Sequence, residues 1–213
     1  MSETLAHKSS YYLKNKSRIM QEVTDFLAHA RTTIVELYGE TTALKVADET
    51  LSKSEALFAN LPDIGGDKNF LIRNFYLGAV MLSIYKVLKA RAKPPEDAGR
   101  IVYNAIKSQL HTSPPPFLLK ENEQAVQELI SKRKKAAEDS QKRNLPYDWM
   151  TFFLEGDGKS FDWGIDYSSC GICKLYQDHA ASEMIPFVCA LDLPIYQARG
   201  IGLVRTKTLA QGD

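Results

Sequence analysis

The sequence predicts an α+β fold, in which an N-terminal helical region is followed by a small antiparallel sheet with a packed helix. Two observations support this fold class. Apolar residues recur every three or four positions through much of residues 1–146, as they do on the buried face of a helix. From residue 147 onward, β-branched and aromatic runs flank a glycine turn, which is typical of strands. We expect the regions 1–146 and 147–213 to form one compact domain.

The helical region divides at glycines and prolines. The expected helices span residues 17–38, 41–59, 69–91, 96–110 and 120–143. The third is apolar around much of its circumference, so we expect it at the centre of the core. The fifth contains the basic run Lys132-Arg133-Lys134-Lys135. A solvated helix face is the usual explanation of such a run, and no interleaved aromatic residues support an anion-binding role.

The C-terminal region is predicted to run strand, hairpin, strand, helix, strand. The first two strands lie on either side of the turn sequence Gly156-Asp157-Gly158, at residues 149–154 and 161–167. A helix at 172–197 follows, interrupted or capped near Pro186 and Pro194. Residues 200–209 return to a strand pattern and are expected to close the sheet.

Composition limits the classes of partner. The 213 residues are 44% hydrophobic and carry a net charge of +1, which gives no bulk attraction to nucleic acid or to acidic lipids. No apolar run has the length of a signal peptide or a membrane span. We therefore expect a soluble, cytoplasmic protein with a small-molecule substrate and neither nucleic acid nor membrane as partner. The long helices also offer a surface for a homo-oligomer.

All three cysteines, Cys170, Cys173 and Cys189, fall in the last quarter of the sequence. Cys170 precedes a predicted helix, whose N-terminus lowers a thiol pKa, so it is a candidate nucleophile or ligand-contacting thiol. The Cys-x-x-Cys pair also fits zinc or iron, but a structural zinc site needs four ligands, and only Cys189 and His179 remain to complete one. A redox pair lacks the thioredoxin-like context. Cys173 and Cys189 are most simply explained as small buried hydrophobes.

Two further side chains are candidates for binding. Asp192 follows Cys189 by three residues, hence on the same helix face, where a carboxylate can orient a thiol, a water or an amidinium group. Arg205 lies in the predicted last strand, close to Thr206 and Thr208. Its guanidinium offers a fork of donors suited to a carboxylate. The alternative for Arg205 is an internal ion pair with Asp166, Asp192 or Glu183. Both interpretations are compatible.

Three motifs occur in order along the last quarter: Asp-Tyr-x-x-Cys-Gly-Ile-Cys from Asp166, Pro-x-x-Cys-x-x-Asp from Pro186, and Arg-Thr-x-Thr-Leu-Ala-x-Gly from Arg205. With them the sequence resembles the L-2-amino-thiazoline-4-carboxylic acid hydrolase family. The resemblance covers about the last quarter well. A weaker similarity to vinyl-reductase-type small-ligand domains agrees with an α+β fold.

The resemblance implies a hydrolase acting on carbon–nitrogen bonds of cyclic amidines, which opens the isothiourea ring of 2-amino-thiazoline-4-carboxylate to N-carbamoyl-cysteine. Such a reaction needs a carboxylate anchor, a partner for the amidine-like group, and a nucleophile or base. We assign Arg205, with Thr206, Thr208 and Asp166 nearby, to substrate binding. Asp192 is assigned to the amidine, and Cys170 or Cys189 to the nucleophile.

Two hypotheses from other classes remain. The same pocket in a sensory module would bind a small ligand or a metal without turnover, with Cys170, Cys173 and Cys189 as the ligands of any zinc or iron. The long helices would also suit a purely structural or oligomerisation role. Retained metal in the purified protein, measured by elemental analysis, would favour the sensory module.

Overall fold

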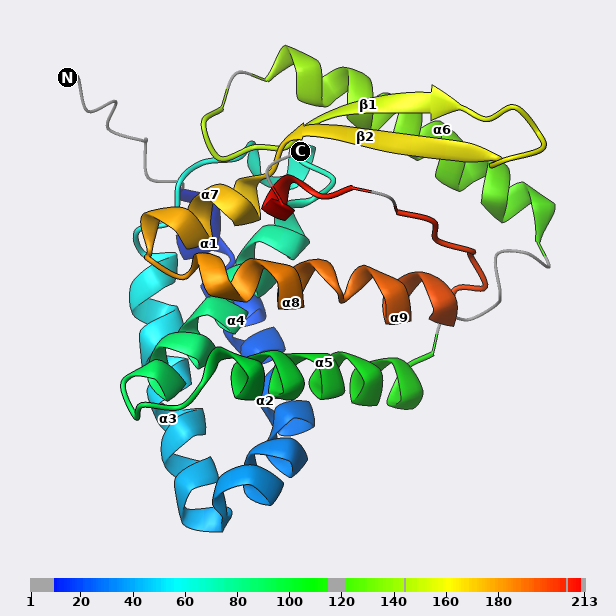
Figure 1. The fold of residues 1–213 in the computed structure, drawn as a ribbon. Coiled ribbons are helices and arrows are strands. Elements are labelled where there is room, and N and C mark those ends of the chain that lie inside the picture. The colour runs from blue at the N-terminus through cyan, green and yellow to red at the C-terminus, as the bar shows by residue number, and fades with distance from the viewer. Residues whose placement is uncertain (1–9, 115–121, 144, 206, 212–213) are drawn as a thin grey trace.

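The structure is a computed structural model that describes residues 10–114, 122–143, 145–205 and 207–211. Its first part is helical: a short α1 (Ser10–Lys14) leads into α2 (Lys16–Tyr38), α3 (Glu40–Phe58), α4 (Ile72–Lys89) and α5 (Pro95–Thr112). A single 3-10 turn, η1 (Gly66–Lys68), precedes α4. The four long helices agree with the expected spans to within a few residues (Figure 1).

Helix α4 is the centre of the core, as its composition predicted. Nearly every residue from Phe75 to Leu88 is buried, on all sides of the helix. Helices α3 and α5 contact it, and so does α7 (Gly171–Asp178) from the C-terminal part of the chain. Gly39, with φ of +80°, makes the sharp turn that lets α3 follow α2 directly. These helices form the support on which the rest of the chain is built.

Helix α6 (Glu123–Lys142) covers a two-stranded antiparallel sheet of β1 (Met150–Glu155) and β2 (Trp163–Ser169) (Figure 1). In its register, Phe153 lies opposite Ile165. Buried Ser140 of α6 attaches the helix to the sheet, because its Oγ accepts the Thr151 backbone N–H at 3.0 Å and bonds the Ala137 carbonyl at 2.7 Å. The α+β fold class is confirmed.

The strands are joined by residues 156–162, a longer connection than a two-residue turn. Asp157 organises it: one carboxylate oxygen accepts the backbone N–H groups of Lys159 at 2.8 Å and Ser160 at 2.7 Å. These bonds hold the pKa of Asp157 at about 2. The hairpin expected around Gly156-Asp157-Gly158 is therefore present, with an aspartate-centred loop at its tip.

The single helix expected at 172–197 is a series of shorter pieces, α7 (Gly171–Asp178), η3 (Ser182–Met184), α8 (Ile185–Cys189) and α9 (Asp192–Ala198). Pro186 lies in the first turn of α8, where its missing N–H costs nothing. Helices α8 and α9 pack on α5, and in Figure 1 they form a layer between α5 and the hairpin. Elements from before and after residue 147 thus share one core cluster.

The expected closing strand at residues 200–209 is wrong. Within the described part of this segment no residue pairs with a strand, and the sheet consists of β1 and β2. Its interactions come from a side chain instead, because Arg205 bonds the carbonyl of Cys189 and the carboxylate of Asp192. The segment passes between the hairpin and α8, and η4 (Leu209–Gln211) contacts both β2 and α8 (Figure 1).

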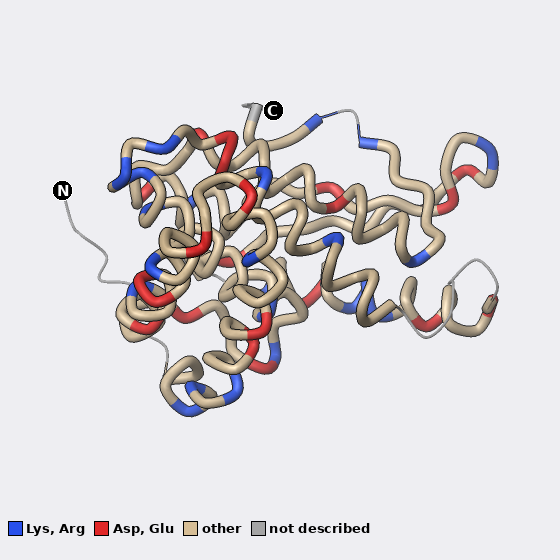
Figure 2. The backbone as a smooth tube through the Cα atoms, turned by 90° about the horizontal axis from the view of Figure 1, so that it is seen from below, with Lys and Arg blue, Asp and Glu red and all other residues tan. Residues whose placement is uncertain are grey.

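Charge is distributed evenly over the fold. Figure 2 shows basic and acidic positions interspersed along the chain, with no face of one sign. In the part of the chain that the structure describes, no helix is both long and apolar enough to cross a membrane.

Candidate functional site

Cys170 lies where β2 turns into α7, and its thiol caps the helix. The residue has extended backbone angles, φ −135° and ψ 116°, and its Sγ accepts the Cys173 backbone N–H at 3.5 Å. Gly171 permits this tight transition, because a Cβ there would lie 2.1 Å from the Tyr147 carbonyl oxygen. Any other residue would push the start of α7 away from this position.

The surroundings of Cys170 favour its thiolate. The pKa of the thiol is lowered from 9.0 to about 7, first because the Cys173 side chain donates a hydrogen bond to it. The backbone N–H groups of Cys173 and Ile172 and the side chain of Trp149 add further donors, while burial acts in the opposite direction. The thiolate of Cys170 is thus favoured relative to that of an ordinary cysteine. This is the expected behaviour of a thiol at a helix N-terminus.

The other two cysteines are thiols rather than thiolates. The pKa of Cys173 is raised, because it is the donor to Cys170 and is itself buried. Burial and the neighbouring Cys170 also raise the pKa of Cys189. Of the two cysteines predicted as nucleophiles, Cys170 therefore has the more reactive environment.

A buried polar network fixes Trp149 beside Cys170. One oxygen of Asp148 accepts the Trp149 backbone N–H at 2.8 Å and the Asn69 amide at 2.7 Å, and the other oxygen accepts Arg143 Nε at 2.5 Å. The Trp149 ring packs edge-on against Phe75, with centroids 5.9 Å apart. Every polar atom of this carboxylate has a partner, so the network is a rigid support for the indole.

Arg205 forms the ion pair that was the alternative to substrate binding. Its Nη1 donates to Asp192 Oδ2 at 3.0 Å and to the Cys189 carbonyl at 2.9 Å. Asp192 begins α9 and its side chain is 51% exposed. Burial by the surrounding protein raises the pKa of Asp192, and the charges of Arg205 and Arg133 oppose that rise. The structure therefore brings Asp192, Arg205 and Cys189 together.

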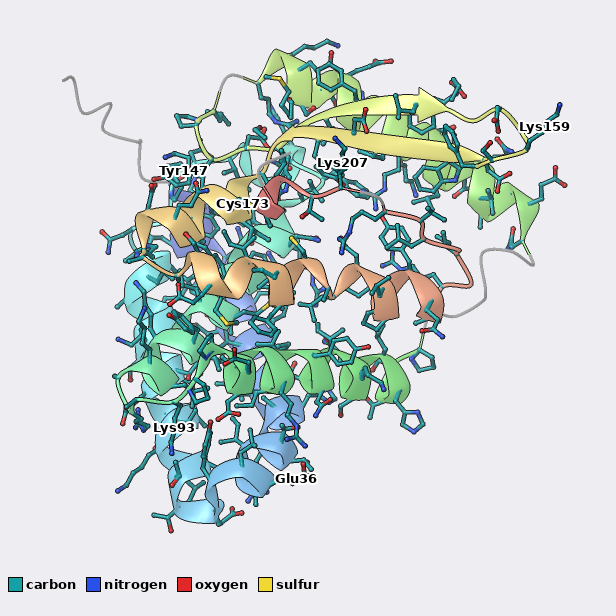
Figure 3. All side chains as sticks on the ribbon, viewed as in Figure 1. Glu36, Lys93, Tyr147, Lys159, Cys173 and Lys207 are labelled. Carbon is teal, nitrogen blue, oxygen red and sulfur yellow. The ribbon has the colours of Figure 1, made fainter. Side chains whose placement is uncertain are left out.

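The remaining predicted binding residues are less closely associated with the thiol. Asp166 is exposed on β2, one position before Tyr167, so its side chain points to the opposite face of the strand from Tyr167. Thr206 lies outside the described residues. Thr208 directly precedes η4. In Figure 3, the label of Lys207 marks where this segment runs between the hairpin and α8, and the label of Cys173 marks α7.

Sequence reasoning missed a cavity whose lining includes Trp149, the side chain that donates a hydrogen bond to Cys170. It lies between α6, the hairpin and residues 69–71, and Arg133, Tyr167, Trp149 and Phe70 are among its lining residues. Arg133 Nη2 donates to the Tyr196 hydroxyl at 3.1 Å, and its guanidinium lies 4.7 Å from the centroid of the Phe70 ring. Arg133 belongs to the basic run that we interpreted as a solvated face, and Tyr167 to the Asp-Tyr-x-x-Cys motif.

A metal site needs several ligand side chains that point to one centre. Within the described ranges, no group of three or more histidine, cysteine or acidic side chains is arranged to hold a metal ion. His179, considered as a fourth ligand, instead shares a hydrogen bond with Lys86 Nζ at 2.8 Å. A zinc or iron at Cys170, Cys173 and Cys189 stays a prediction.

The fold and site define a class of protein: a small α+β protein with a cysteine at a helix N-terminus and a carboxylate–arginine pair at Cys189. A sequence model of the L-2-amino-thiazoline-4-carboxylic acid hydrolase family matches residues 73–213. The chain therefore belongs to that family. The match runs from α4 to the last residue and includes the three cysteines, Asp192 and Arg205, whereas Asn69 and Phe70 lie just before it. No curated protein and no solved structure gave a significant match.

Proposed function

We propose that this protein is a thiol-dependent hydrolase that opens the ring of 2-amino-thiazoline-4-carboxylate to give N-carbamoyl-cysteine. Family membership supports the hydrolase class. The observation that carries the proposal is Cys170, whose pKa of about 7 provides a thiolate at neutral pH, at the end of a strand and the start of a helix. An electrophilic ring carbon between nitrogen and sulfur is a suitable target for such a thiolate.

The reaction proceeds in two steps. In the first, the Cys170 thiolate attacks the ring carbon, the carbon–sulfur bond of the ring breaks, and the departing sulfur takes up one proton. This leaves an isothiourea joined to Cys170. In the second, the oxygen of a water molecule adds to the same carbon and Cys170 leaves as the thiolate. One water proton goes to nitrogen and the other is released, so the net change is the addition of one water.

Asp192 and Arg205 support this chemistry. The ring carbon is more electrophilic when the amidine-like group of the substrate is protonated, and a carboxylate beside its nitrogens stabilises that amidinium form. Asp192 is the acidic side chain that shares its surroundings with Cys189 and Arg205. The hydrogen bond from Arg205 holds the Asp192 carboxylate in one orientation, so Arg205 acts as a positioning residue for it. We assign the nucleophile to Cys170 rather than Cys189, because the pKa of Cys189 is raised.

The test is release of free thiol from 2-amino-thiazoline-4-carboxylate by the purified protein. We expect Cys170→Ser to lower kcat by about 100-fold or more, because an alcohol replaces the thiolate. The matched control, Cys189→Ser, removes a thiol from the same region and should keep most of the activity. The reaction is repeated with a chelator, because the metal-binding alternative requires sensitivity to it. Equal release by the wild type and by Cys170→Ser would overturn the proposal.

A further inference from the structure

We propose that Arg133 binds a carboxylate group of the ligand, in the cavity beside Cys170, and so determines which substrates reach the thiol. The cavity lies between α6, the hairpin and residues 69–71. The identity of the ligand rests on the proposed hydrolase function. Recognition of a carboxylate rests only on the side chains of this cavity.

Arg133 is a charged side chain with unused donors. Its Nε is buried and has no hydrogen-bond partner, while Nη2 donates to the Tyr196 hydroxyl at 3.1 Å. Within the described residues, Arg133 forms no salt bridge. A buried N–H of a guanidinium without an acceptor is costly, and such groups in native proteins call for an explanation. A bound anion supplies the missing acceptor.

Other cationic side chains near Arg133, unlike Arg133 itself in the described part of the chain, form salt bridges with carboxylates. Arg143, which lines the same cavity, pairs with Asp148, and Arg205 pairs with Asp192. On α6 itself, Lys134 pairs with Glu155. The charges of these side chains are already compensated by protein carboxylates. Among the described residues, Arg133 has no carboxylate within salt-bridge distance: it donates to a phenol, its guanidinium carbon lies 4.7 Å from the centroid of the Phe70 ring, and its charge acts on Asp192, which Arg205 already pairs.

Cys170 does not itself line the cavity, but two of the lining side chains relate Arg133 to the thiol. Tyr167 and Trp149 both line it, and the Trp149 side chain donates a hydrogen bond to Cys170. Both Arg133 and Cys170 act electrostatically on Tyr167, which is 39% exposed but whose hydroxyl is partly desolvated by the surrounding protein, so that its pKa is raised to about 12. The phenol is therefore protonated at neutral pH and is a second donor for an anion. A ligand whose carboxylate lies at Arg133 would extend past Tyr167 toward Cys170.

These features define the class of ligand. The fork of Arg133 suits a carboxylate, with the phenol of Tyr167 close by. The ring of Phe70 provides an apolar wall for a small flat molecule. The ligand would thus be a small carboxylic acid with an electrophilic carbon only a few atoms from the carboxylate. Arg205 is the rival anchor from the sequence analysis, but its Nη1 already donates to two protein oxygens.

The experiment compares alkylation of Cys170 by iodoacetate, which carries a carboxylate, and by iodoacetamide, its neutral analogue. We follow the modified Cys170 peptide by mass spectrometry and take the ratio of the two rates. In Arg133→Met we expect the ratio to fall about tenfold, because a charged hydrogen bond to the reagent is lost. Arg133→Lys, which keeps the charge but not the fork, should give an intermediate ratio. The iodoacetamide rate itself reports whether each variant is folded around Cys170.

Lys132→Met is the matched control, because it removes the same charge from an exposed neighbouring position on α6. Its ratio should equal that of the wild type. An unchanged ratio in Arg133→Met, or an equal fall in Lys132→Met, would overturn the proposal, and a tenfold fall in Arg205→Met alone would move the anchor there. Neither reagent requires turnover. Failure to hydrolyse the thiazoline would therefore refute the proposed function and leave the result for Arg133 standing.

Discussion

The Cys173 side chain should control the ionisation of Cys170, because it is the largest contributor to the lowered pKa. Together, the donors around Cys170 lower its pKa from 9.0 to about 7 and so favour the thiolate. Cys173→Ala removes the S–H donor and keeps the backbone N–H groups at the start of α7. We expect the pKa of Cys170 to rise by about one unit, because the thiolate loses one donor.

The assay is the rate of iodoacetamide reaction at Cys170 as a function of pH. In the wild type the rate should follow the thiolate fraction, with a midpoint near pH 7. Because the folded-state pKa is lowered, the thiolate is lost as pH falls through that value, and kcat/KM for hydrolysis should decline over the same range. The midpoint should move to about pH 8 in Cys173→Ala.

Cys173→Ser is the matched control for this substitution, because its hydroxyl replaces the S–H donor with an O–H donor. Its midpoint should stay close to that of the wild type. Identical midpoints in the wild type and in Cys173→Ala would refute the reasoning, since the donated hydrogen bond would then contribute nothing. A midpoint near pH 9 in the wild type would refute the activation of Cys170 altogether.

Two further predictions concern the supports of the site. Gly171→Ala should lower the free energy of unfolding, measured by chemical denaturation, by about 1–3 kcal/mol, because the new Cβ would lie 2.1 Å from the Tyr147 carbonyl oxygen. Gly202→Ala is the control: its Cβ meets no atom of the described residues within 4 Å, so the free energy of unfolding should not change. Asp148→Asn should cost about 3 kcal/mol in the same measurement, because Arg143 loses its buried counter-charge. Asp139→Asn, at a looser pair of 3.8 Å with Lys135, should cost less than about 1 kcal/mol; equal losses in the two aspartate variants would contradict this account.

Most of the fold could be predicted from the sequence because it depends on local periodicity. The apolar repeat of residues 17–38 and the uniformly apolar stretch of α4 specify a peripheral and a central helix without any knowledge of their neighbours. The closing strand at 200–209 could not be judged in this way. A strand needs a partner at a sheet edge, and here Arg205 bonds to α8 and α9 instead.

In the candidate site, too, the residues that depend on local sequence could be predicted and those that depend on distant contacts could not. Cys170 was identified because its position before a helix is a local property of the chain. Arg133 was not, because three lysines stand beside it in the sequence, and only the helical phase turns it toward the cavity. Its contacts, Phe70 and Tyr196, are each 63 residues away along the chain. No sequence pattern joins them.

The most direct test of the central claim is the mass of the protein during turnover. Samples quenched in acid after milliseconds to seconds with 2-amino-thiazoline-4-carboxylate would be digested and analysed by mass spectrometry. The two-step reaction predicts an adduct of one substrate molecule on the Cys170 peptide, which disappears as substrate is consumed and is absent in Cys170→Ser. Thiol release by the wild type with no adduct at any time, or with an adduct on the Cys189 peptide, would contradict the assignment of Cys170 as the nucleophile.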